Sequence, residues 1–134
     1  MEPAARRDRL AAARVARLAT VTPGGRPHLV PCCFALVEET AYSAVDAKPK
    51  STLALRRLAN LRANPQASLL VDHYAEEWAT LWWIRVDGDG RVVDDGAERT
   101  TALAALAAKY EQYRRQPPPG AVIALDITAW RAWP

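Results

Sequence analysis

The segment Asp46-Ala-Lys-Pro-Lys-Ser51 gathers the residues of this sequence best suited to hold an anion. Only three of the 18 basic residues are lysines, so two lysines within three positions depart from the overall composition. Pro49 restrains the backbone between Lys48 and Lys50. Ser51 stands where a helix is expected to begin, and the free N–H groups at a helix start attract anions. The segment therefore predicts a phosphate seat, with an exposed basic loop as the alternative.

A second segment, from Gly25 to Cys32, combines apolar residues typical of a strand with two prolines, Pro27 and Pro31. A proline cannot donate to a strand ladder, so it marks an edge, a bulge or a segment that meets something other than a strand. Two interpretations stay open. The segment is either a bulged edge strand, or a strand that offers free backbone groups to the edge of a planar ligand.

No side chain is assigned to catalysis. Neighbouring residues on a strand point to opposite faces, so Cys32 and Cys33 cannot easily bridge each other. They are interpreted as small buried residues rather than as a catalytic thiol. His73 has acidic neighbours but no second histidine beside it, so no metal site is predicted. Rossmann, Walker A and Gly-x-Ser-x-Gly motifs are absent from the sequence.

Three tryptophans occur within six positions, at Trp78, Trp82 and Trp83. Adjacent strand residues face opposite sides, so one of Trp82 and Trp83 is expected to look away from the core. A partner subunit or a ligand would then cover it, and a peripheral helix of the same chain is the alternative.

Length and composition limit the class of protein. A chain of 134 residues, half of them hydrophobic and a quarter charged, indicates one globular domain spanning 1–134. The net charge of +3 is mild and the arginines are scattered, so no nucleic-acid partner is expected. No apolar run approaches the ~20 residues of a membrane span. The charged N-terminus lacks the apolar core of a signal peptide, so a cytoplasmic location is expected.

The elements that must position these residues are mainly strands. Three strands, at 15–21, 27–37 and 41–46, are joined by short turns and predict a meander. Further strands are expected at 66–74, 80–86, 91–93 and 121–127, with a tight turn at Gly88-Asp-Gly90. Helices are expected at 3–13, 51–63 and 97–115. About six to seven largely antiparallel strands with peripheral helices indicate a mainly β (α+β) protein with a closed or partly closed barrel.

Several short pieces of the sequence, in this order and spacing, resemble a known family. They are Arg17–Pro31, then Tyr42 with Asp46–Lys50, then Asn64–Val71. Together they resemble the pyridoxamine 5′-phosphate oxidase-like (PPOX-class) split β-barrel family. More narrowly, the chain resembles the actinobacterial branch of probable coenzyme F420-dependent oxidoreductases. The resemblance covers almost the whole chain and implies a fold of the flavin-reductase type.

The resemblance also implies a site and an assembly. In the family the second strand lays its backbone along the flavin or deazaflavin ring, and basic residues after the third strand hold the cofactor phosphate. The family forms homodimers with two cofactor sites at the subunit interface, where a small-molecule substrate also binds. The positions that match the cofactor-binding residues are Val30, Pro31, Cys32, Cys33, Ser43, Lys48, Lys50 and Ser51.

The implied activity is hydride transfer between coenzyme F420 and an unidentified small organic acceptor. The alternatives are an FMN-dependent oxidoreductase on the same barrel and a non-catalytic flavin or haem binder. A haem would need an axial histidine, and only His28 and His73 are available. Val30 stands at the position of the family's phosphate-binding arginine, and the long C-terminal substrate segment is missing. Both departures argue against pyridoxamine phosphate oxidation.

Overall fold

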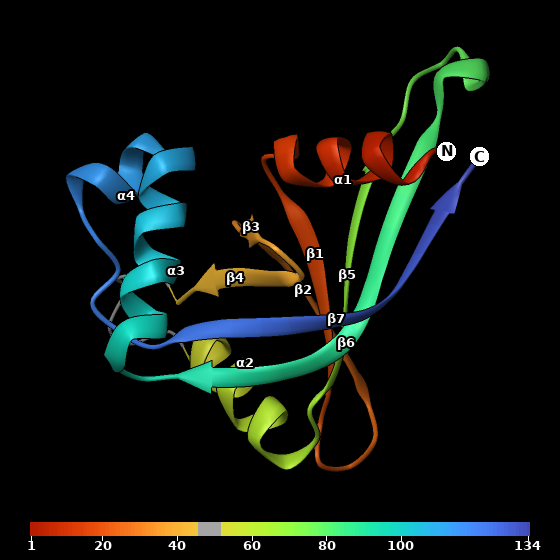
Figure 1. The fold of residues 1–134 in the computed structure, drawn as a ribbon. Helices are drawn as coiled ribbons and strands as arrows, with labels where there is room; N and C mark the ends of the chain where they lie inside the picture. Colours follow the sequence, from red (N-terminus) through yellow and green to blue (C-terminus); the bar gives the residue numbers. More distant parts are fainter. Residues whose placement is uncertain (46–51) are drawn as a thin grey trace.

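The protein is a single antiparallel sheet curled around an apolar core, with helices at its ends and on one flank (Figure 1). The computed structural model describes residues 1–45 and 52–134. The elements in chain order are α1 (Pro3–Ala12), β1 (Ala16–Val21), β2 (Pro27–Cys32), β3 (Ala35–Val37), β4 (Thr40–Ala44), α2 (Thr52–Ala63), β5 (Gln66–His73), a 3₁₀ turn (Trp78–Thr80), β6 (Trp82–Val93), α3 (Gly96–Lys109), α4 (Glu111–Arg115) and β7 (Val122–Trp133).

The strand order explains how the sheet becomes a barrel. Neighbours pair in the order β2-β1-β5-β6-β7-β4-β3, and every pairing is antiparallel. The two edge strands, β2 and β3, are consecutive in the chain and are joined only by Cys33 and Phe34. The edges must therefore approach each other, which leaves a barrel that is split at this corner. The predicted α+β split barrel of about seven strands is confirmed.

The predicted meander of the first three strands is wrong. The segment 27–37 forms two strands, and β2 pairs only with β1 while β3 pairs with β4 at the opposite edge of the sheet. The physical reason lies at Phe34, between β2 and β3. Its side chain is fully buried in the core, and there the chain leaves one edge strand of the sheet and enters the other. Short connections show that strands are antiparallel, but they do not show which edge each strand joins.

The predicted turn at Gly88-Asp-Gly90 is also wrong, because β6 runs without interruption from Trp82 to Val93. The register of β6 against β7 shifts between Asp87 and Gly88, which is a β-bulge. A side chain on Gly88 would collide with the carbonyl of Asp126, and one on Gly90 would crowd Leu61. These glycines permit close packing rather than reversal of the chain.

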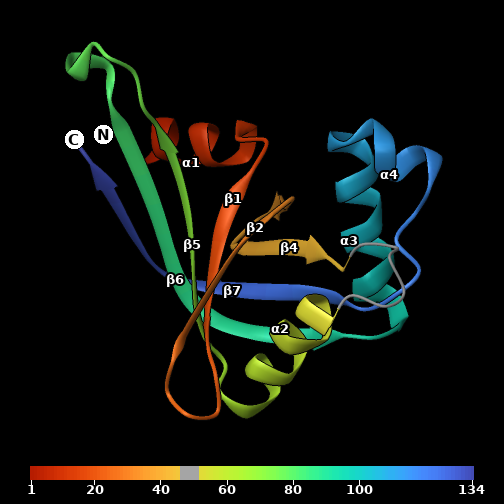
Figure 2. The same ribbon diagram turned by 180° about the vertical axis from the view of Figure 1, so that it is seen from behind.

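Helices close the two ends of the barrel and cover one flank. Leu10 of α1 and Leu61 of α2 join the main core at opposite ends (Figures 1 and 2). The predicted helix 97–115 is divided into α3 and α4 at Tyr110, and both pack on a second apolar cluster beside β3 and β4. None of the helices that the structure describes is long and apolar enough to cross a membrane.

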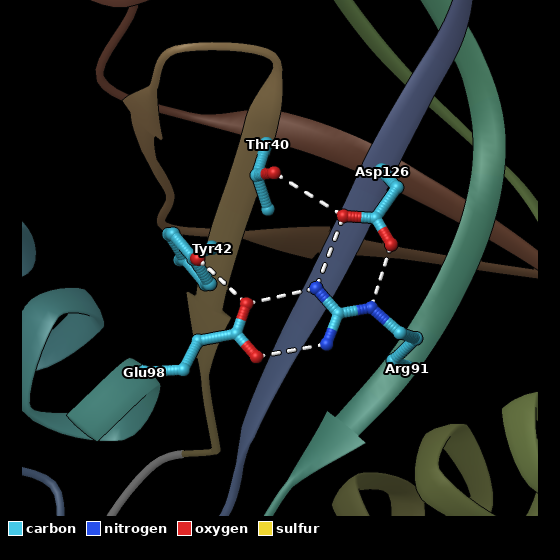
Figure 3. A network of polar contacts seen from close by, with 5 residues as sticks. All are labelled: Thr40, Tyr42, Arg91, Glu98 and Asp126. Carbon is cyan, nitrogen blue, oxygen red and sulfur yellow. Dashed lines mark hydrogen bonds and ion pairs between the residues drawn. The ribbon is translucent and has the colours of Figure 1, made fainter. Parts of the chain in front are cut away.

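A polar network fastens α3 to the sheet (Figure 3). The Arg91 guanidinium on β6 forms paired hydrogen bonds to Glu98 of α3, both 2.8 Å, and to Asp126 of β7, at 2.6 and 3.0 Å. On β4, Tyr42 donates to Glu98 at 2.8 Å and Thr40 donates to Asp126 at 3.2 Å. Every charge in this network has an opposite charge within hydrogen-bond distance.

Candidate functional site

The corner between β2 and β3, Cys33 and Phe34, is held by three side chains from two other parts of the chain. The Ser43 hydroxyl on β4 donates to the carbonyl of Cys33 at 2.8 Å. The Phe34 N–H donates to the Tyr110 hydroxyl at 3.1 Å, and the Lys109 ammonium donates to the Phe34 carbonyl at 2.9 Å. Each backbone polar group named here is satisfied by a side chain, so the corner has a defined conformation without strand pairing.

The two cysteines at this corner are free thiols with different surroundings. Cys32 is buried, whereas Cys33 is half-buried. Burial raises the pKa of the Cys32 thiol, and this outweighs the opposing effects of the Ser43 hydroxyl and the Arg57 charge. The thiol of Cys32 is therefore protonated at neutral pH, which does not suit a nucleophile. The expectation of small buried side chains is confirmed for Cys32 and is wrong for Cys33, which is only half-buried.

The outer edge of β2 is open. Strand β2 ends the sheet, and among the described residues no hydrogen bond joins the backbone of 28–32 to any element other than β1. Val30 is half-buried and Pro31 is exposed on this strand. The structure thus bears out an edge strand that contains proline. Because this edge presents backbone groups without a partner among the described residues, it can pair with the polar rim of a flat ligand.

Arg57 on α2 places a positive charge near this edge, because that charge acts on the Cys32 thiol at the end of β2. Its Nε is buried and has no hydrogen-bond partner among the described residues. One helical turn later, the buried Asn60 amide donates to Thr20 on β1 at 3.1 Å and fixes the helix against the barrel. A buried guanidinium nitrogen without a partner is costly unless a ligand satisfies it.

The predicted phosphate seat is covered only in part. Lys48, Lys50 and Ser51 lie outside the described residues. Ser43 is buried, and its proton is engaged by the Cys33 carbonyl. Sequence reasoning did not assign Arg57 to the site. The signal that could have found it is its spacing, because residues 57 and 60 share one face of a helix and Asn60 is buried.

The outer face of β1, β2, β5 and β6 carries two hollows. The first, of about 470 Å³, is lined by strands β1, β5 and β6 and by the β1–β2 turn. On its floor Ser68 donates to Asp87 at 2.6 Å, and Arg85 donates to both carboxylate oxygens of Asp87. Burial raises the pKa of Asp87, but these hydrogen bonds lower it more, so the carboxylate stays ionised.

The second hollow, of about 630 Å³, is aromatic and is lined by Trp82, Trp83, Trp133, His73 and Tyr74 among others. Trp82 packs against the core and stacks on His73, with ring centroids 6.2 Å apart. Its neighbour Trp83 also lines the hollow but is not among the residues packed against the core. The prediction that one of these two tryptophans looks away from the core is confirmed. The described residues contain no cluster of three or more potential metal ligands.

The split barrel and its open edge agree with a comparison of the sequence. Residues 2–134 match the sequence model described as pyridoxamine 5′-phosphate oxidase. The chain belongs to this family. The family resemblance drawn from the sequence is therefore confirmed. Among curated proteins, the chain has no match.

Solved structures share the fold of this family member at low sequence identity. A conserved hypothetical protein from Mycobacterium tuberculosis has a TM-score of 0.80 at 20% identity, with 99% of this chain and 84% of that chain covered. A heme binding protein from Mycobacterium smegmatis has a TM-score of 0.76 at 20% identity, covering 99% and 55%. An FAD binding protein from the same organism has a TM-score of 0.64 at 18% identity, covering 99% and 94%.

Proposed function

We propose that this protein is an oxidoreductase that transfers hydride between coenzyme F420 and a small organic acceptor. The observation that carries the proposal is the open edge of β2 beside Arg57, whose buried Nε has no hydrogen-bond partner among the described residues. Backbone groups along Val30–Cys33 can meet the polar rim of a deazaflavin ring, and Arg57 stands at the end of the same strand. The bound cofactor would supply the hydride chemistry itself.

The protein's part in this reaction is to bind and to orient. The edge of β2 would fix the plane of the ring, while Arg57 with Lys48 and Lys50 would hold the anionic tail by charge-assisted hydrogen bonds. The Cys32 thiol is protonated and enclosed, so it would act as a wall of the site rather than as a base. A polyanionic tail suits several cations, which favours F420 over FMN with its single phosphate.

The proposal includes a homodimer that buries the outer face of the sheet. This face bears Leu29, 67% exposed, and at its upper end Trp133, 51% exposed. It also carries charges of both signs in the lining of the two hollows, namely Arg85 with Asp72, Asp87 and Asp89. A two-fold interface places the same patch on both subunits, so a patch with apolar groups and both signs of charge can complement itself. Each hollow would then be closed by the partner.

A tetrapyrrole is the second candidate ligand, and one feature supports it. The aromatic hollow is about 630 Å³ in volume and has His73 in its wall, so it offers both a flat apolar surface and an imidazole. A structural neighbour is a heme binding protein, although the likeness to it extends only to the fold. Titration with haem separates this candidate from the proposed one.

The test is a fluorescence titration of the purified protein with F420, FMN and haem. We expect F420 to bind most tightly. Replacing both Lys48 and Lys50 by alanine should weaken F420 binding by at least ~2 kcal/mol, the scale of lost charge-assisted bonds. The matched control is the pair Arg114→Ala and Arg115→Ala, which removes the same charge from α4. The proposed function would be refuted if the protein bound haem tightly and did not bind F420. It would also be refuted if neither double variant changed the affinity for F420.

A further inference from the structure

Lys109, at the end of α3, has an unusual environment for a lysine. Its ammonium donates to the Phe34 carbonyl at 2.9 Å and lies 3.9 Å from the centre of the Phe34 ring and 5.3 Å from that of Tyr110. No carboxylate of the described residues forms an ion pair with it. The charge is instead stabilised by a backbone oxygen and by two aromatic faces.

The Tyr110 hydroxyl depends on this ammonium. It accepts the Phe34 N–H and has a single proton to give, with the carbonyls of Phe34 and Arg14 both 3.0 Å away. While Lys109 serves the Phe34 carbonyl, the hydroxyl proton is available to Arg14. Through these hydrogen bonds the side chains of Lys109 and Tyr110 connect the junction of α3 and α4 to the corner and to the segment before β1. Without the ammonium, one carbonyl loses its charged donor.

Charge at this position is sensitive to pH. Burial, and after it the positive charge of Arg14, lowers the pKa of Lys109 from 10.5 to about 8, although the Cys33 and Cys32 thiols act in the opposite direction. These groups and the Tyr110 phenol are the titratable groups of the described chain that face the ammonium. Below this pKa the group is a cation, and above it the group is a neutral amine that is a weaker donor.

We propose that Lys109 is a positioning residue for the cofactor site: its ammonium holds the Cys33–Phe34 corner, and through it the open edge of β2, in the conformation that binds the cofactor. The inference rests on the proposed function. The corner continues directly from Cys32 and Cys33, whose backbone belongs to the proposed ring-binding edge. A shift of the Phe34 carbonyl therefore moves that edge, although Lys109 itself need not touch the cofactor.

The test measures F420 affinity from about pH 6.5 to about pH 9.5 for the wild type, Lys109→Arg and Lys109→Met. The arginine variant keeps its charge over this range, so the ratio of wild-type to Lys109→Arg Kd cancels any titration of the coenzyme itself. We expect this ratio to rise about tenfold across the range as the binding-competent fraction falls. Lys109→Met should bind weakly at every pH, also under conditions where it is fully folded.

A cofactor-free measurement separates the possible failures. The amide resonance of Phe34 should titrate with Lys109 in the wild type and stay constant in Lys109→Arg. A flat ratio of Kd values, together with F420 binding by Lys109→Met as tight as by the wild type, would overturn this inference and leave the proposed function intact. Absence of F420 binding by the wild type at any pH would instead refute the proposed function, and this inference with it.

Discussion

The Arg91 network and the corner at Phe34 use cations in opposite ways. Arg91 meets two carboxylates with four hydrogen bonds, and its own pKa is raised by them. At the corner, Lys109 has no carboxylate partner in the described chain. Near the adjoining end of β2, the buried Nε of Arg57 has no hydrogen-bond partner among the described residues. A paired charge stabilises the fold, whereas an unpaired half-buried charge has capacity left for a ligand. The two regions should therefore respond differently to mutation.

The largest effect on stability is expected from Arg91→Ala. This change leaves Glu98 and Asp126 without their shared cation, and Tyr42 then donates to an isolated carboxylate. We expect the free energy of unfolding to fall by about 2 kcal/mol, a value already reduced because both ends of the network are partly exposed. Urea unfolding measures it, and F420 affinity should stay unchanged.

The control for this change is Arg115→Ala, which breaks the exposed ion pair between Arg115 and Glu111 on α4. Exposed pairs of this kind contribute less than about 0.5 kcal/mol. If Arg91→Ala costs no more than Arg115→Ala, the network is only a surface arrangement and the contrast with the corner disappears.

Arg57→Gln should show the reverse behaviour. Because its buried Nε lacks a partner among the described residues, which is itself costly, removal of the guanidinium should not lower the free energy of unfolding. The same change should weaken F420 binding about tenfold, which corresponds to ~1.4 kcal/mol. Arg62→Gln, on the same helix with a more exposed side chain, is the matched control and should leave the affinity unchanged. Loss of stability without loss of affinity would assign Arg57 to the fold.

Features of the fold that depend on residues close together in the sequence could be predicted from it, whereas features that depend on contacts between distant segments could not. The edge character of β2 followed from Pro27 and Pro31, because a missing donor is a local property. The place of Phe34 could not be predicted, because the side chains that hold its backbone, Tyr110 and Lys109, lie 76 and 75 positions later in the chain. The pattern of Gly88 and Gly90 predicts a turn, but these glycines instead allow close contacts with β7 and α2, which are not adjacent to them in the sequence.

The predicted site shows the same division. Lys48 and Lys50 were chosen for their rarity and spacing, which are visible in the sequence. Lys109 is the third lysine, and its sequence neighbours give no reason to single it out. Only the contact with the Phe34 carbonyl, 75 positions away in the chain, distinguishes it. Arg57 likewise is distinguished by its position, because its charge acts on the Cys32 thiol at the end of β2, which the sequence does not show.

The smallest effect sharpens the comparison through acid. Hydrogen bonds from Arg91, and then from Tyr42, lower the pKa of Glu98 from 4.5 to about 2. A carboxylate whose folded pKa is depressed contributes stability above about pH 4.5, and this contribution is lost as the pH falls toward 2. After allowance for the partial exposure of Glu98, we expect the free energy of unfolding of the wild type to exceed that of Glu98→Gln by about 1 kcal/mol at neutral pH. Near pH 2 the two values should be nearly equal. Urea unfolding at several pH values measures this difference. Acid should therefore weaken the fold through Glu98, whereas mild alkali should weaken binding through Lys109. If the stability difference between the wild type and Glu98→Gln persists at low pH, packing rather than charge holds α3 on the sheet.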